Sequence, residues 1–281
     1  MEKKEKIAAA LGIFDGIHTA HRKVLKNALE IGDKALCITF KSLPETKSGG
    51  ILMQNEIKEA KLLEMGFNKV IMLDFHKIRN MSGEEFLQMI REEYGITHFC
   101  CGFNYHFGKN GSGNIETLKN YCAKNGLEAI IEEEVLMDEE KISSSIIREC
   151  LKAGKVEKAN KLLSHPIEIV TEVMHGDKRG RTIGFPTINQ PVPEGFAEMK
   201  YGVYSTTVSI DGKEYKAITN LGIRPTFKLD TPICETYIID FSGDLYGKKV
   251  NLKFNKFIRS EEKFSSLEEL KNQLKKDIQN I

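Results

Sequence analysis

The spacing of apolar residues changes near residue 165 and divides the 281-residue chain into two parts of different fold class. Before this point, short apolar runs alternate with stretches in which apolar residues recur three and four positions apart, which indicates strands separated by amphipathic helices. After it, apolar and polar residues alternate, as in 250–255, which is typical of strands with one buried face. Proline follows the same border, because only Pro44 of the 7 prolines precedes residue 165. A chain of this length favours about two domains, and we expect them at 1–164 and 165–281.

The first part predicts an α/β domain with a parallel sheet, because strands separated by helices join through right-handed crossovers. The expected strands are Ile7–Phe14, Ala35–Phe40, Lys69–Leu73, Thr97–Cys101 and Glu128–Ile131. The expected helices are His21–Ile31, Ile57–Met65, Gly83–Tyr94, Ile115–Asn125, Ser145–Lys152 and Val156–Leu163.

The second part predicts an antiparallel barrel or sandwich that ends in a helix. Tyr201–Ile210 and Lys213–Asn220 flank an Asp-Gly pair, which is a strong hairpin signal. Cys234–Phe241 is a further run of strand-forming residues. In the last segment, serines followed by glutamates predict a capped helix. Its capping residues are Ser265, Ser266, Glu268 and Glu269, and its expected apolar stripe is Leu267, Leu270, Leu274 and Ile278.

Composition argues against several classes of protein. With 41 basic and 40 acidic residues, the chain lacks the net positive charge of a globally basic nucleic-acid binder. No apolar run approaches the length of a membrane-spanning helix, and the run Ile7–Phe14 is short for a signal peptide. The six cysteines contain no Cys-x-x-Cys pair and fit no zinc signature. We therefore expect a cytoplasmic protein with reduced, mostly buried thiols, acting without nucleic acid or membrane.

A glycine- and histidine-containing segment links the first expected strand to the first helix. It runs from Gly12 to His21 and reads Gly-Ile-Phe-Asp-Gly-Ile-His-Thr-Ala-His. A helix that begins at the carboxyl end of a parallel strand offers free N–H groups to a phosphate. His18 and His21 are three positions apart, so both can face one ligand and stabilise its charge during transfer. The alternative is that they are solvated residues at the start of a helix.

A second segment, from Gly176 to Asn189, is rich in glycine and cations and ends in Pro-Thr-Ile-Asn. Cations spaced by flexible residues can wrap a polyphosphate. Thr187 and Asn189 lie two apart, so in an extended chain both side chains face one way. Their oxygens suit Mg²⁺. The alternative is a solvated basic loop.

The first segment resembles the nucleotidyltransferase motif of the bacterial bifunctional riboflavin kinase/FMN adenylyltransferases, also called FAD synthetases. Gly102–Gly108 resembles that family's flavin-side loop, and Lys141–Arg148 its nucleotide-binding serine–arginine motif. The resemblance implies a Rossmann-like nucleotidyltransferase domain in which His18 and His21 bind the ATP phosphates and support the transfer. The remaining ATP-binding residues that it implies are Gly12, Phe14, Asp15, Gly16, Ser144, Ser145 and Arg148, with Asn104 on the flavin side.

The segment from Gly176 to Asn189 resembles the kinase motif of the same family, which implies an antiparallel β-barrel riboflavin kinase domain. The ATP-binding residues that it implies are Gly176, Lys178, Gly180, Arg181, Thr187 and Asn189, of which Thr187 and Asn189 hold the metal. Cys234–Asp240 also matches, and there the resemblance implies that Glu235 is the general base for the riboflavin 5′-hydroxyl. Without that context, a lone carboxylate on such a strand reads as an exposed residue. Arg259 and Phe264 fall in the segment expected near the flavin.

The resemblance spans nearly the whole chain and implies an enzyme that makes FMN from riboflavin and FAD from FMN. It implies Mg²⁺-ATP as co-substrate, with the flavins as substrates and products. Position 20 departs from the family pattern, since Ala20 stands where glycine is usual. One alternative is therefore a kinase without adenylyltransferase activity. Another is a flavin- or RNA-binding regulator that uses residues 178–181 as a basic patch.

Overall fold

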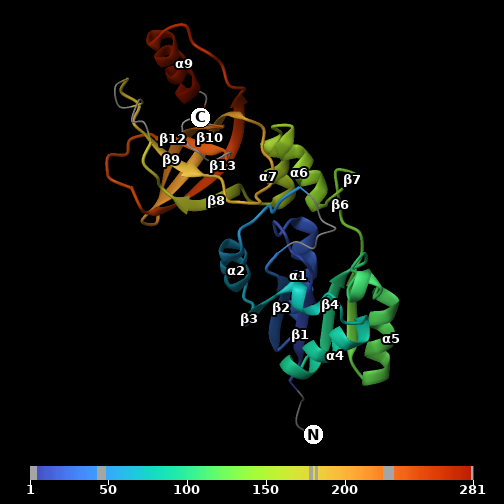
Figure 1. The fold of residues 1–281 in the computed structure, drawn as a ribbon. Helices are drawn as coiled ribbons and strands as arrows, with labels where there is room; N and C mark the ends of the chain where they lie inside the picture. The colour runs from blue at the N-terminus through green and yellow to red at the C-terminus, as the bar shows by residue number, and fades with distance from the viewer. Residues whose placement is uncertain (1–4, 43–48, 177–179, 181–182, 224–230, 280) are drawn as a thin grey trace. The chain divides into compact units, whose positions relative to one another are not determined.

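The structure is a computed structural model that describes the chain except residues 1–4, 43–48, 177–179, 181–182, 224–230 and 280 (Figure 1). Its contacts define two compact units. The first unit comprises Met1–Ser48 and Asn55–Ser143, and the second comprises Gly49–Gln54 and Ser144–Ile281. The sequence pattern changes at residues 164 and 165. That this position separates two functional domains stays a prediction.

The first unit is the predicted α/β domain, built on a five-stranded sheet of order β3-β2-β1-β4-β5 in which every pair is parallel. Its strands are β1 (Ile7–Leu11), β2 (Lys34–Phe40), β3 (Lys69–Leu73), β4 (His98–Gly102) and β5 (Glu128–Glu132). Its helices are α1 (Thr19–Ile31), α2 (Asn55–Glu64), α3 (Phe75–Ile78), α4 (Gly83–Tyr94) and α5 (Ile115–Asn125). A 3₁₀ turn (Lys109–Gly111) and a short hairpin of β6 (Leu136–Met137) and β7 (Glu140–Lys141) complete it.

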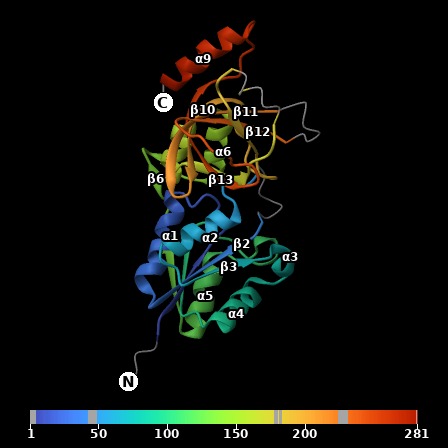
Figure 2. The ribbon, with the colours of Figure 1, turned by 90° about the vertical axis from the view of Figure 1, so that its left-hand side faces the viewer.

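Helices cover both faces of this sheet (Figure 2). On one face, Phe86 and Ile90 of α4 and Leu118 of α5 pack against Leu11 and Phe99 in a continuous apolar core. On the other face, α1 contacts β1 and β4. The six cysteines of the chain are free and buried, as expected. The expected first strand, Ile7–Phe14, is too long, because the chain leaves the extended conformation after Leu11.

The second unit holds a six-stranded antiparallel sheet of order β8-β13-β10-β11-β12-β9. Its strands are β8 (Ile167–Glu172), β9 (Thr187–Pro191), β10 (Gly202–Ile210), β11 (Lys213–Gly222), β12 (Ile233–Ile238) and β13 (Lys249–Arg259). The sheet curls so that its edge strands β8 and β9 approach each other and are joined by isolated hydrogen bonds. Gln190 of β9 donates to Thr171 O of β8 (3.1 Å), and the amide of Met174, just beyond β8, donates to Asn189 O (2.8 Å). The predicted barrel is therefore confirmed as a curled half-barrel.

Two helices, α6 (Ser144–Lys152) and α7 (Val156–Leu163), pack with this barrel. Asn160 of α7 donates to Phe254 O (2.8 Å) and accepts from Ile167 N (2.9 Å). Gly49–Gln54 also belongs here, since the Gln54 side chain exchanges two hydrogen bonds with the Val170 backbone (3.0 and 2.7 Å). No pattern in the sequence marks this segment as part of the barrel unit.

The C-terminal helix α9 (Leu267–Gln279) is capped as predicted by Ser266, whose Oγ accepts from Glu269 N (3.2 Å). Its expected apolar stripe is wrong in part, because Leu267 is 66% exposed. Within the helix the buried residue is Asp277, at 1% exposure. The rest of the stripe, Leu270, Leu274 and Ile278, is half-buried, and an ion pair of Asp277 with Arg259 joins the helix to β13.

Candidate functional site

The turn between β1 and α1 has an unusual backbone. Phe14 and Ile17 have φ of 50° and 42°, and Gly16 lies between them at 80°. Side chains other than glycine rarely adopt positive φ, and such strain persists where surrounding structure enforces it, often at binding sites. Gly12 is needed for packing, because a Cβ there would lie 2.8 Å from the Phe14 ring. The turn is thus a tightly determined backbone at the carboxyl end of a central strand.

The two predicted histidines lie together at the start of α1. His18 is the N-cap, and its Nδ1 accepts a hydrogen bond from His21 N (3.3 Å). The two imidazoles stack with centroids 3.5 Å apart, and the Phe14 ring meets His21 edge-on at 5.3 Å. Because Nδ1 of His18 is an acceptor, its proton in the neutral ring is on Nε2, which can then donate to a ligand. The helix N-terminus adds partial positive charge.

Asn104 follows β4, the strand hydrogen-bonded to β1, so both loops leave the same edge of the sheet. Chain order reverses between β1 and β4, which makes this edge a topological switch point where open α/β sheets bind ligands. Tyr105 and Phe107 stack at 5.4 Å and fix the loop, while Asn104 and Phe103 remain exposed. The fold therefore places Asn104 at the same sheet edge as the two histidines.

Ser144, Ser145 and Arg148 lie in the first turns of α6, which belongs by its contacts to the second unit. Arg148 Nε donates to Gly50 O (2.7 Å). Their phosphate-binding role stays a prediction.

The barrel brings two of the predicted residues, Glu235 and Asn189, into one row across three strands. Glu235 of β12 is directly opposite Asn189 of β9 and Asn220 of β11. Directly opposed side chains in an antiparallel pair lie about 4.5–5.5 Å apart at Cβ. Thr187 is opposite Tyr237, two positions along on the same face. Glu235 therefore lies between two carboxamides, next to the predicted metal ligands.

Asn220 was not among the predicted site residues. Its Nδ2 donates to Glu261 (3.2 Å), which adds a second carboxylate near the row. These three residues, Asn220, Glu235 and Glu261, are far apart in the sequence. Their proximity becomes visible only once the strands are paired.

The segment before β9 packs closely on Asn189. A Cβ at Gly176 would lie 2.3 Å from Asn189 Nδ2, so only glycine fits there without displacing the amide. The Gly180 carbonyl accepts from Phe185 N (2.9 Å) and Ile183 N (3.2 Å). Phe185 in turn meets the Tyr237 ring edge-on at 5.2 Å. The predicted phosphate-binding residues Lys178 and Arg181 lie outside the described residues.

We expect Gly176→Ala to lower the rate of phosphoryl transfer at this site by on the order of 10²-fold, because displacing a positioning group by about 1 Å has that effect. The affected group is the Asn189 amide, which is paired in register with Glu235 and which the new methyl group would displace. Steady-state rates of phosphate transfer, compared with a second reaction catalysed by the other unit, would measure this. Equal loss of both reactions would indicate general misfolding instead.

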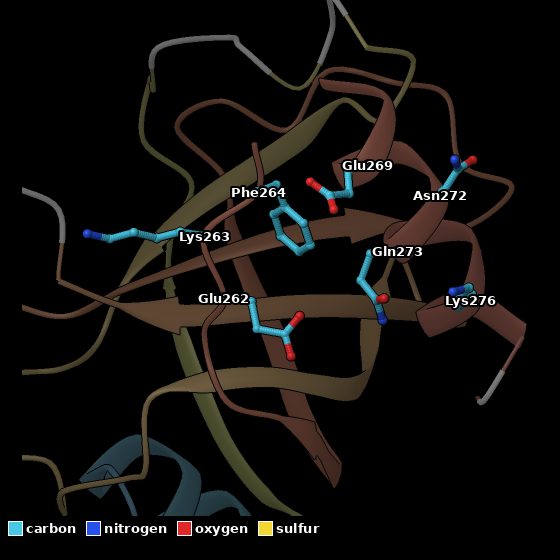
Figure 3. Close-up of a pocket in the computed structure, with 7 residues that line it drawn as sticks. All are labelled: Glu262, Lys263, Phe264, Glu269, Asn272, Gln273 and Lys276. Carbon is cyan, nitrogen blue, oxygen red and sulfur yellow. The ribbon is translucent and has the colours of Figure 1, made fainter. Parts of the chain in front are cut away.

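A pocket of about 510 Å³ lies between the segment after β13 and helix α9 (Figure 3). Its lining residues are Glu262, Lys263, Phe264, Glu269, Asn272, Gln273 and Lys276. Phe264, predicted to lie near a flavin, lines it, whereas Arg259 is not one of the lining residues. Arg259 donates to both carboxylate oxygens of Asp277 (2.8–3.1 Å), and its guanidinium carbon is 5.6 Å from the Phe264 ring centroid. Direct contact of Arg259 with a ligand stays a prediction.

Among the described residues, no group of three or more His, Cys, Asp or Glu side chains could hold a metal ion. No helix in the described ranges is long and apolar enough to cross a membrane.

Family models match both parts of the chain. A model described as FAD synthetase matches residues 1–146, and one described as riboflavin kinase matches residues 163–281. A bifunctional riboflavin kinase/FMN adenylyltransferase from Listeria monocytogenes is 36% identical over 96% of this chain and 90% of its own length. The protein of that name from Bacillus subtilis is 33% identical over 99% of this chain and 92% of its own length.

A solved structure also matches along the whole chain. It is described as a macrolide-efflux protein from Streptococcus pneumoniae, and it is 30% identical with a TM-score of 0.88. The match covers 99% of this chain and 94% of that chain. The description of this structure names a different activity from that of the relatives. The two family models, by contrast, each correspond to one of the two activities in the name of the relatives.

Proposed function

This chain belongs to the family of bifunctional riboflavin kinases/FMN adenylyltransferases, and from that premise we propose how its residues divide the two reactions. The chain phosphorylates riboflavin to FMN with ATP and then joins FMN to the AMP part of ATP, giving FAD and pyrophosphate. The observation that carries our assignment of residues is the pair of sites, one at a sheet switch point with two stacked histidines and one around Glu235.

In adenylyl transfer, a phosphate oxygen of FMN attacks the α-phosphorus of ATP, and the bond to pyrophosphate breaks. His18 and His21 donate hydrogen bonds to the phosphates, and the N–H groups of the turn and of α1 add to the binding. Asn104 contacts the flavin side. Ser144, Ser145 and Arg148 bind phosphate as well, with Arg148 suited to bidentate pairing. Positioning and charge neutralisation supply most of the rate, with no covalent enzyme intermediate.

In phosphorylation, the 5′-hydroxyl oxygen of riboflavin attacks the γ-phosphorus of ATP while Glu235 accepts the hydroxyl proton, and ADP leaves. Asn189 and Asn220 flank Glu235 on the two neighbouring strands. The pocket beside Phe264 is within the usual size range for a small-molecule site, and an aromatic ring there suits the flavin.

Thr187 and Asn189 are the residues that would hold Mg²⁺. The hydroxyl and amide oxygens, beside a carboxylate on the same face, match the hard oxygen ligands that Mg²⁺ prefers. When bound with ATP, the ion neutralises charge on the phosphates. Gly176 packs closely against the Asn189 side chain, which supports a fixed position for that amide.

We further propose that the enzyme is cytoplasmic and acts on small molecules alone, without nucleic acid or membrane. Six free, buried thiols and the near-neutral net charge support this.

The full chain incubated with riboflavin and Mg²⁺-ATP is expected to form FMN first and then FAD, with one pyrophosphate released for each FAD. Separation of the flavins by chromatography over time checks this. Formation of FMN without FAD would show that the chain has only the kinase activity, and Ala20 would then be the first residue to test as the cause. Riboflavin binding without turnover would favour a regulator instead.

A further inference from the structure

Lys58 of α2 is a buried lysine that neither reaction uses. It is 4% exposed, although lysine is almost never fully buried without a partner. Burial lowers the pKa of Lys58 from its ordinary value, and the negative charge of Asp15 opposes that shift. Because burying a charged group is unfavourable, we expect a buried lysine to have a structural or chemical role.

Its ammonium group is tied to the end of β2. Lys58 Nζ donates to Phe40 O (2.8 Å) and lies 3.4 Å from Thr39 Oγ1. Thr39 Oγ1 in turn donates to Ile13 O (2.7 Å), inside the turn that leads to the histidines. A continuous series of hydrogen bonds therefore connects α2 to that turn.

The same turn carries Asp15, which is 4% exposed. A buried carboxylate is costly unless a positive or hydrogen-bonding group compensates it, and Lys58 is close enough for its charge to be felt. Asp15 stands between Phe14 and Gly16, both in the left-handed region. Backbone strain of this kind holds only where neighbouring groups enforce it.

We propose that Lys58 is a positioning residue for adenylyl transfer. Its buried ammonium group, hydrogen-bonded to Thr39 and Phe40, holds the turn from Gly12 to His18, through Thr39 and Ile13 O, in the shape that presents His18 and His21 to the ATP phosphates. This inference rests on the proposed adenylyltransferase function of that site. In this proposal Lys58 does not contact ATP, because its ammonium group donates its hydrogen bonds to residues of β2.

The kinase in the same chain provides an internal control. Lys58→Met keeps an unbranched apolar side chain and removes the ammonium group, and we expect it to lower kcat for FAD formation from FMN by about 10–100-fold. The KM for ATP should change less than kcat, and riboflavin phosphorylation should stay within about twofold. Lys58→Arg, which keeps the charge, should recover a large part of the lost rate. Lys26→Met, an exposed lysine of the same unit, should leave both rates unchanged.

A double variant separates positioning from simple packing. If Lys58 acts through Asp15, Lys58→Met combined with Asp15→Asn should lose no more activity than the worse single variant, because both remove one coupling. Additive losses would overturn the proposal. So would normal FAD formation by Lys58→Met, or equal loss of both enzyme activities with no recovery by Lys58→Arg. Failure of the unaltered chain to make FAD would instead refute the proposed function.

Discussion

Glu235→Gln is expected to lower kcat for riboflavin phosphorylation by about 10²–10⁴-fold, the usual effect of removing a general base. Glutamine has nearly the same shape, so the row of Asn189, residue 235 and Asn220 should persist. It cannot take the proton of the 5′-hydroxyl, and the attacking oxygen is then a poorer nucleophile. Rates of FMN formation at saturating Mg²⁺-ATP measure the effect.

Two controls keep this result specific. FAD formation from supplied FMN should be unchanged, since that reaction is assigned to the other unit. Glu214→Gln removes an exposed carboxylate from the neighbouring strand, where it pairs with Lys253, and should leave both activities intact. Riboflavin binding, followed by its fluorescence, should survive in Glu235→Gln. An unchanged kcat would mean that Glu235 is only an exposed strand residue.

Local sequence patterns predict the five strands and the long helices of the first unit, but not α3 or the hairpin of β6 and β7. Its helices bury apolar residues at regular spacing and carry their own caps, so α4 and α5 have the predicted bounds. The first strand was predicted too long, because the apolar residues Ile13 and Phe14 continue its pattern although Phe14 turns into the left-handed region. Apolar character reports burial but not backbone dihedral angles.

The site around Glu235 depends on contacts that local patterns do not encode. Which residues flank Glu235 is decided by the registers of β12 with β9 and β11, and these join segments far apart in the chain. A shift of one residue would turn every side chain to the opposite face. Gly49–Gln54 shows the same limit, since its pairing with Val170 gives no periodic signal in the sequence.

The helix α9 shows a different limit, because its fully buried residue is a charged one rather than a member of the apolar stripe. Leu267 begins the stripe yet is exposed, while Asp277 is buried against Arg259. Sequence periodicity counts apolar residues and gives no weight to an ion pair.

Asp277→Ala is therefore expected to destabilise the second unit by about 3–5 kcal/mol, the usual result of removing one partner of a buried ion pair. Arg259 would lose three hydrogen bonds to the carboxylate, and Gln273 would lose the acceptor for its Nε2 (2.9 Å). Because α9 lines the pocket beside Phe264, the KM for riboflavin should also rise. Thermal inactivation of each activity in the full chain measures the first effect, and the kinase should be lost at a lower temperature than the adenylyltransferase.

Glu262→Gln is the matched control, because Glu262 pairs with the same arginine at 3.8 Å but its side chain is 55% exposed. Exposed pairs of this kind contribute less than about 1 kcal/mol, so the inactivation temperature of the kinase should hardly move. The two carboxylates thus differ in burial and in hydrogen bonding to Arg259, and the comparison tests the buried, hydrogen-bonded pair as the source of the effect. Equal stability losses in both variants would contradict it, as would an Asp277→Ala protein as stable as the unaltered chain.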